Sequence, residues 1–220
     1  MGEQKAYQES EEERNARANR KAALRKAAQD KELSTKTMAR RGVLLVYTGN
    51  GKGKTTAALG LALRALGQGM GVAVVQFTKG RWRTGERRFF QDMTSSHKGK
   101  LLFKSMGDGF TWETQDRAAD IRAAERAWKQ VETVLQEARD DKTTWQMLIL
   151  DELNSILRYG YLSIEHVCAV LRARPSHLHV VVTGRNADAR LMELADTVTE
   201  MKNIKHAYQA GMRAQSGIEF

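Results

Sequence analysis

Residues 43–56, VLLVYTGNGKGKTT, join an apolar run to a glycine-rich loop that carries lysine, and this segment limits the possible folds more than any other. The apolar run predicts a buried strand, and the apolar residues after the loop predict a helix. Glycine at alternate positions of 49–53 lets backbone N–H groups approach phosphate oxygens, and the helix adds its positive N-terminal end. Lys54 supplies a charge and Thr55 a hydroxyl for Mg²⁺. The segment therefore predicts a binding site for the phosphates of a nucleoside triphosphate.

The loop departs at one position from the generic pattern G-x-x-x-x-G-K-[ST]. Thr48 stands where the first glycine is expected, and Gly49 follows one step later. A dinucleotide-binding G-x-G-x-x-G loop is excluded because residue 56 is Thr56. The alternative is a lysine-rich surface turn with chance glycines, but the flanking strand and helix favour the phosphate-binding interpretation.

Composition indicates one core and no disulfide framework. A chain of 220 residues with 41% hydrophobic content can bury one substantial core, so we expect a single domain with an appended arm. One cysteine, Cys168, excludes an intrachain disulfide and a cysteine-rich metal site, which favours a cytoplasmic protein. Its apolar, helix-like surroundings favour a buried structural thiol over a nucleophile. We expect no membrane span and no signal peptide, because no apolar run is long enough.

The formal net charge of +10 and the pI near 9.8 suggest a polyanionic ligand. That ligand could be nucleic acid or the phosphates of a nucleotide. Residues 1–42 hold eleven Lys and Arg against seven Asp and Glu, so most of the excess charge lies in the body. A nucleic-acid-binding arm would concentrate more of it.

The N-terminal region differs from the rest of the chain. Residues 11–33 are charged and alanine-rich, with Leu24 and Leu33 as the large apolar residues, so they favour a helix that has no face to bury. A solvated tail and a helix that docks over a bound ligand both remain open. We expect a basic helical arm and linker at 1–41, with the linker at 34–41, and one domain at 42–220.

The body alternates strand-like and helix-like runs, which predicts an α/β fold with a mainly parallel sheet and helices on both faces. Strands are predicted at residues 43–47, 72–77, 101–104, 147–150, 179–183 and 197–201. Helices are predicted at residues 54–66, from 112 or 113 to 139, at 164–172 and at 187–194.

Polar residues follow two of the predicted strands. Asp151 and Glu152 end the apolar run 147–150, where acids can hold Mg²⁺ opposite a phosphate-binding loop. Arg185 follows the run at 179–183, at the sheet edge where α/β folds bind ligands. It could reach a phosphate or lie on the surface near the next helix.

Residues 107–112, GDGFTW, place two aromatics among glycines where a strand leaves the sheet. Such aromatics either anchor the loop in the core or form an apolar wall for a large flat ligand. The pattern of residues leaves both options open.

Together these segments resemble the ATP:corrinoid adenosyltransferases of the bacterial P-loop type, enzymes that place an adenosyl group on the cobalt of vitamin B12 and its precursors. The resemblance covers about residues 40–220, and GFTWETQ at 109–115 is its most specific segment. The other matching segments are 47–56 (YTGNGKGKTT), 75–80 (VQFTKG), 85–87 (GER), 150–153 (LDEL), 173–175 (ARP), 183–185 (TGR), 194–198 (LADTV) and 205–207 (KHA). Thr48 agrees with this family.

The resemblance implies a P-loop NTPase-like fold and assigns roles around ATP. Reduced Co(I) would attack the 5′ carbon, the whole triphosphate would leave, and Lys54, Thr55 and Glu152 would be the catalytic residues. Thr55 and Glu152 would hold Mg²⁺ or Mn²⁺, Asp151 would support them, and Asn50 would lie near the ribose. The ATP contacts would come from Gly49, Asn50, Gly51, Lys52, Gly53, Lys54, Thr55, Thr56 and Arg185.

The resemblance also assigns the aromatic loop and the partners. Phe110 and Trp112 would pack beneath the corrin and exclude its lower axial ligand, which makes reduction to Co(I) easier, and Met106 would extend this wall. The family implies a homodimer, a flavin-type reductase, and neither nucleic acid nor membrane as partner. Residues 92–100 and 139–144 depart from the family pattern, which puts any reductase contact in doubt.

Two other functions compete with adenosyl transfer. The positive charge and basic arm also suit a P-loop ATPase that acts on nucleic acid. A non-catalytic corrinoid-binding protein would keep the aromatic loop without turnover.

Overall fold

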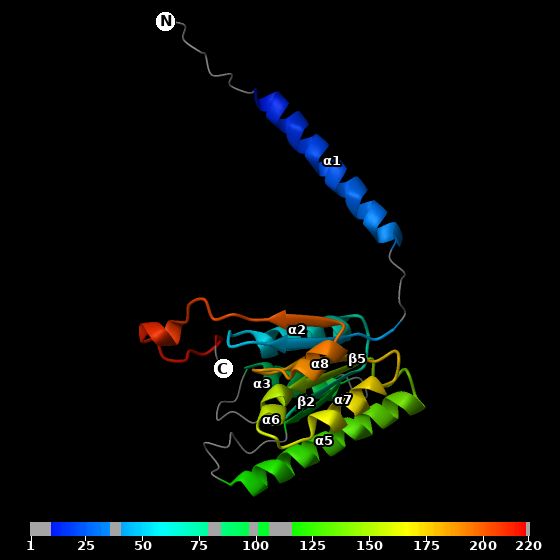
Figure 1. Ribbon diagram of the computed structural model, residues 1–220, viewed down its shortest axis with the longest axis vertical. Helices are drawn as coiled ribbons and strands as arrows, with labels where there is room; N and C mark the ends of the chain where they lie inside the picture. Colours follow the sequence, from blue (N-terminus) through cyan, green and yellow to red (C-terminus); the bar gives the residue numbers. More distant parts are fainter. Residues whose placement is uncertain (1–9, 36–40, 79–84, 97–100, 106–115, 219–220) are drawn as a thin grey trace, which may run out of the picture. The chain divides into compact units, whose positions relative to one another are not determined.

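The sheet of this protein is parallel throughout. The computed structural model describes residues 10–35, 41–78, 85–96, 101–105 and 116–218. Six strands lie in the order β3-β2-β4-β5-β1-β6, and each neighbouring pair is parallel. Their bounds are β1 Leu44–Thr48, β2 Val72–Gln76, β3 Leu101–Ser105, β4 Met147–Asp151, β5 His179–Thr183 and β6 Thr197–Glu200. The predicted α/β fold and its six strands are confirmed (Figure 1).

Helices cover both faces of the sheet, because its central strands are apolar on both sides. The described helices of this unit are α2 Lys54–Gly67, α3 Gly85–Ser96, α5 Arg117–Asp140, α6 Leu153–Arg158, α7 Ile164–Arg172 and α8 Ala189–Leu194, and a 3₁₀ turn, η1, covers Ala207–Ala210. All five residues of β4 are buried, as expected for a strand with helices on both faces.

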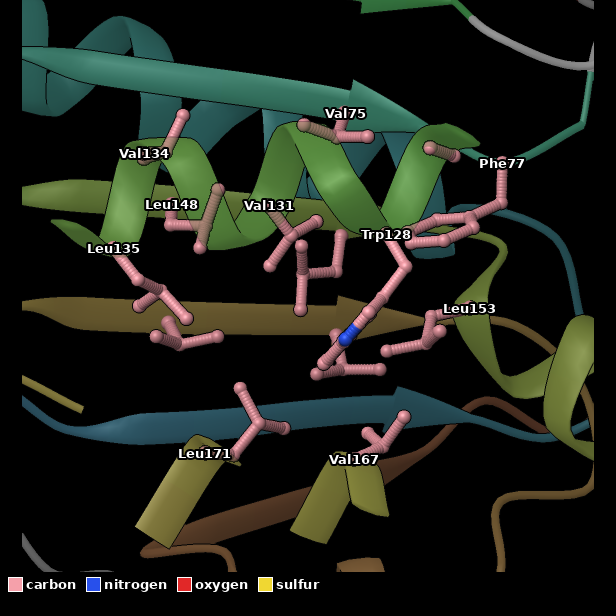
Figure 2. Close-up of a cluster of buried hydrophobic side chains, with 14 of the residues drawn as sticks. Val75, Phe77, Trp128, Val131, Val134, Leu135, Leu148, Leu153, Val167 and Leu171 are labelled. Carbon is pink, nitrogen blue, oxygen red and sulfur yellow. The ribbon is translucent and has the colours of Figure 1, made fainter. Parts of the chain in front are cut away.

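Two apolar clusters fill the two sides of the sheet. Leu148 and Leu150 of β4 pack with α5 and α7, whereas Met147 and Ile149 pack with α2 and α3. Figure 2 shows the first cluster, where Trp128 and Leu135 among others reach from α5 towards the strands. The alternation follows from the two-residue period of a strand.

Three helix assignments need correction. Helices α3 and α6 were not predicted, and α8 begins two residues after its predicted start at 187. The segment of α3 contains several charged residues, and the sequence assigned no helix to it. Glu152 precedes α6 with φ 62° and caps no N–H group, so the usual start signal is missing. Asp188 caps α8 by accepting from the Arg190 N–H at 2.9 Å, which sets its start.

Within the described residues, the long helix α5 begins at Arg117. Asp116 caps it by accepting the Ala119 N–H at 2.9 Å. The predicted start at 112 or 113 lies outside the described residues.

Contacts divide the chain into two units, Met1–Arg40 and Arg41–Phe220. The described part of the first is α1, Glu11–Thr35, and none of its residues is buried. Ser10 and Glu13 cap this helix reciprocally, each side chain accepting the other residue's backbone N–H, at 2.9 and 3.2 Å. Helix α1 is therefore stabilised by its cap and its propensity, not by a core.

Within the described residues, we find no helix with the length and hydropathy that crossing a bilayer requires.

Candidate phosphate-binding site

The ends of four strands meet at one edge of the sheet. The strands are parallel, so their carboxyl ends lie together, and the register pairs Gln76 with Asp151 and Tyr47 with Thr183. The glycine loop follows β1 and the acidic pair ends β4, with β5 between these two strands. This edge is the candidate site.

The glycine loop requires its glycines for two reasons. Gly49 and Gly53 have φ of 95° and 102°, which favour glycine. A Cβ at Gly49 or Gly51 would lie 2.4 or 2.7 Å from the carbonyl oxygen of Met201, after β6. The Gly51 N–H also donates to that oxygen at 2.7 Å. The close approach of phosphate therefore explains these glycines only in part, and the contact with Met201, which the sequence does not predict, is the second reason.

Lys54 lies beneath the loop. Its side chain is 7% exposed, and Nζ donates to the carbonyls of Gly49 at 2.8 Å and Gly51 at 2.7 Å. Burial lowers the pKa of Lys54, and the carboxylate of Glu152 opposes that shift. The ammonium therefore lies among the loop carbonyls, where a phosphate oxygen would compete with them for its hydrogen bonds.

Asp151 connects three elements. Its Oδ1 accepts from the hydroxyls of Thr183 at 2.7 Å and Thr55 at 2.9 Å, and its Oδ2 accepts from Gln76 Nε2 at 2.9 Å. Burial raises the pKa of this carboxyl, and the three hydrogen bonds oppose the shift. The structure thus joins the glycine loop to the acidic strand end through Thr55 and Asp151.

Glu152 lies next to this network in a strained backbone conformation. Its φ is 62°, its N–H donates to Thr183 Oγ1 at 2.9 Å, and Oε2 accepts from Ser155 Oγ at 2.6 Å. Burial raises the pKa of Glu152, whereas the Ser155 hydroxyl and the charges of Lys54 and Arg185 lower it. Its carboxylate and the two cations are therefore close enough to interact.

Arg185 is exposed at the turn after β5, and its charge acts on both Lys54 and Glu152. Asn154 of α6 holds this turn, since its Nδ2 donates to the Gly184 carbonyl at 3.1 Å. Asn50, Lys52 and Thr56 are exposed on the glycine loop and at the start of α2.

The predicted corrinoid contacts Met106, Phe110 and Trp112 lie outside the described residues. The prediction that they line a corrinoid site stays a prediction.

Sequence reasoning missed several residues that position this site, namely Gln76, Thr183, Asn154, Ser155 and Met201. A signal existed for two of them. Gln76 and Thr183 are polar residues that follow apolar runs at the ends of their strands, the same pattern that indicated Asp151.

The edge offers oxygen ligands of the kind that a hard cation prefers. The hydroxyl of Thr55 and the carboxylates of Asp151 and Glu152 form this set. Among the described residues there is no cluster of three or more His, Cys, Asp or Glu that could hold a metal ion by itself. Mg²⁺ fits such a sparse set, because it usually combines one or two protein oxygens with phosphates and water.

Comparisons with known proteins identify one protein family over most of the chain. The profile of the family described as "ATP:corrinoid adenosyltransferase BtuR/CobO/CobP" matches residues 40–220. The corrinoid adenosyltransferase of Pseudomonas aeruginosa is 46% identical over 208 residues, which cover 94% of this chain and 98% of the relative. A corrinoid adenosyltransferase of Sinorhizobium sp is 45% identical over 208 residues, 94% of this chain and 92% of the relative. Corrinoid adenosyltransferase CobA of Salmonella typhimurium is 45% identical over 180 residues, 82% of this chain and 86% of the relative.

Proposed function

We propose that this protein transfers the 5′-deoxyadenosyl group of ATP to the Co(I) of a corrinoid. The chain belongs to the ATP:corrinoid adenosyltransferase family, and this membership is the basis of the proposal. The observation that carries this proposal is the family match over 40–220, which spans the glycine loop and the acidic strand end that Thr55 and Asp151 join. The charge-based alternative, an ATPase acting on nucleic acid, has no such support, since all three relatives are named for adenosyl transfer.

The reaction moves one electron pair onto carbon and another onto oxygen. The Co(I) lone pair forms a bond to C5′ of ATP, the C5′–O bond breaks, and the triphosphate leaves with the bonding electrons. Negative charge therefore grows on the leaving group, and preorganised donors lower the barrier. The cobalt is the nucleophile, so the protein needs no nucleophilic side chain.

The residues of the edge suit this task. We assign the triphosphate to the backbone of residues 49–53, the Lys54 ammonium and the Arg185 guanidinium, with Thr56 and Lys52 flanking it and Asn50 near the ribose. Support comes from the position of Lys54 under the loop and from the charge of Arg185 acting at the same place. The planar guanidinium of Arg185 and the ammonium of Lys54 can together neutralise several phosphate oxygens.

A divalent cation completes the proposal. Thr55 and Glu152 would hold Mg²⁺ or Mn²⁺, and Asp151 would orient Thr55 through the hydrogen bond of 2.9 Å. When bound, the cation would neutralise part of the charge on the triphosphate. Asp151 already accepts three hydrogen bonds, which favours this supporting role over direct ligation.

The corrinoid and the partners belong to the same proposal. Phe110, Trp112 and Met106 would form an apolar wall that excludes the lower axial ligand of cobalt, so that a flavin-type reductase can supply the electron. We assign a basic helical arm and linker to residues 1–41 and the corrinoid adenosyltransferase domain to residues 42–220. We further propose a homodimer that works in the cytoplasm.

Product analysis tests the proposed function. The protein is incubated with MgATP and chemically reduced corrinoid, and we expect triphosphate together with a light-sensitive Co–C bond. ADP and orthophosphate released in the presence of RNA or DNA, without adenosylation, would favour the ATPase. Corrinoid binding without any turnover would favour a non-catalytic role.

A further inference from the structure

Thr48 occupies the position where the generic phosphate-binding loop has its first glycine. It ends β1 with its side chain buried, at 7% exposure. Its Oγ1 accepts the backbone N–H of Ala187 at 3.0 Å, and its carbonyl accepts the N–H of Met201 at 2.8 Å. The first contact needs the hydroxyl, whereas any residue could make the second. With glycine at this position, the Ala187 N–H would lose its hydrogen bond to the side chain of residue 48.

Ala187 lies two residues beyond Arg185, in the turn that follows β5. This turn, residues 184–187, is held on both sides of the arginine. Before it, Asn154 Nδ2 donates to the Gly184 carbonyl at 3.1 Å, and Asn154 is only 1% exposed. After it, Thr48 holds Ala187. The backbone that carries Arg185 is therefore attached to α6 at one end and to the start of the glycine loop at the other.

The conformation of this turn depends on the contacts that hold it. Gly184 has φ 126°, and a Cβ at Gly184 would lie 2.9 Å from Cβ of Asn154. Asn186 also has a positive φ, of 53°. Positive φ at two neighbours of Arg185 is a conformation that the surrounding contacts must maintain.

The charge of Arg185 reaches the site that these attachments border. It acts on Lys54 beneath the loop and on Glu152 after β4. Because Thr48 directly precedes the glycine loop, its hydroxyl ties the turn of Arg185 to the same strand end that carries the loop. The backbone of Arg185 and the glycine loop are then attached to one another through Thr48.

We propose that Thr48 is a positioning residue, whose hydroxyl holds the 184–187 turn so that Arg185 and the glycine loop bind one triphosphate together. This inference rests on the proposed function in one respect, the assignment of Arg185 to the triphosphate. It explains why a buried hydroxyl stands where the generic loop needs only glycine. It adds no contact between Thr48 and substrate.

A double-mutant cycle with Thr48→Val and Arg185→Ala tests the inference. Valine keeps the shape of threonine and removes the hydroxyl, and Thr48→Ser restores it. The probe is inorganic triphosphate with Mg²⁺, measured by calorimetry on the full chain, so the readout does not depend on adenosyl transfer. Thr133→Val, which removes an exposed hydroxyl bonded to Lys129 within α5, is the matched control.

We expect Thr48→Val to weaken triphosphate binding about five- to tenfold, because Arg185 contributes less to binding once its turn is no longer held. Thr48→Ser should stay close to the parent protein, and Thr133→Val should not change. In the Arg185→Ala background, Thr48→Val should cause no further loss, because its effect passes through the arginine.

Equal losses from Thr48→Val in both backgrounds would overturn the inference, since the hydroxyl would then act on the loop itself. An Arg185→Ala variant with unchanged triphosphate affinity would overturn it together with the role of Arg185. Adenosyl transfer would still be judged by its own products. If Thr48→Val fails to fold, as judged by circular dichroism, Thr48→Ala takes its place in the same cycle.

Discussion

Asp151 shows how single residues in this protein carry both structure and chemistry. It is buried, with 4% exposure, and its three hydrogen-bond donors come from α2, β2 and β5. A buried carboxylate is costly unless it is satisfied in this way. Lys54 is buried too, and its donors point at backbone carbonyls. Both side chains are therefore held in the interior by hydrogen bonds to protein groups.

Lys54→Ala separates the proposed catalytic role of Lys54 from its effect on stability. We expect turnover to fall about 10²- to 10³-fold, because the leaving triphosphate loses a preorganised charge. The melting temperature should stay the same or rise, since burial disfavours the ammonium. Adenosylation assays and thermal denaturation measure the two effects. Lys129→Ala, on the exposed side of α5, is the control, and an unchanged rate in Lys54→Ala would show that the site is wrong.

At the scale of elements, a second polar cluster joins the sheet at the opposite ends of its strands. Asp196, just before β6, accepts the Leu44 N–H of β1 at 2.8 Å and pairs with Arg41 at 2.5 Å. Arg174, which follows α7, lies 3.6 Å from the same carboxylate. These contacts lower the pKa of Asp196, with the Arg41 hydrogen bond as the largest cause. Because β6 is exposed along its whole length, Asp196 is one of the contacts that hold it in place.

Asp196→Asn should therefore destabilise the fold in a pH-dependent way. The pKa of Asp196 is lower in the folded protein than its ordinary 3.8, so its contribution is complete above that value. The contribution is lost as pH falls through the folded pKa. Urea denaturation should show a loss on the order of 1 kcal/mol at pH 7 and a smaller difference at pH 3.

Asp140→Asn is a suitable control for that experiment, because Asp140 is an exposed carboxylate at the end of α5. We expect little change in its unfolding at either pH. A difference between Asp196→Asn and the parent protein that grows on acidification would contradict the proposed role of the ion pairs.

At the scale of the whole molecule, the core belongs to residues 41–220. Both apolar clusters lie in that unit, and α1 buries no residue. The cooperative free energy of unfolding must therefore come almost entirely from the second unit. The arm is available for a role in binding.

Deletion of residues 1–40 tests this division. We expect the melting temperature to change by less than about 2 °C, the shift that roughly 1 kcal/mol would cause in a protein of this size. Affinity for inorganic triphosphate should be retained, whereas corrinoid affinity should fall if the arm orders over that ligand. Calorimetry of the shortened and full chains measures all three, and a large loss of thermal stability would assign the arm to the fold.

Local patterns in the chain predicted most of the secondary structure and the residues with chemical character. The apolar runs before Thr48 and Asp151 identified β1 and β4, and the glycine loop predicted a phosphate site between β1 and α2. Helices α3 and α6 were not predicted. The segment of α3 contains several charged residues, and α6 starts without a capping side chain. Sequence patterns predict an element only where the spacing of apolar residues or a local motif marks it.

The sequence alone determined which side chains we propose for the chemistry, because loop glycines, strand-end acids and the arginine are local signals. Only the tertiary structure decided their partners. Strand β5 lies between β1 and β4, so Thr183 can reach Asp151, and Thr48 can hold Ala187 from a position 139 residues away. No local pattern encodes such pairings, because they depend on which strands become neighbours when both faces of the sheet are buried.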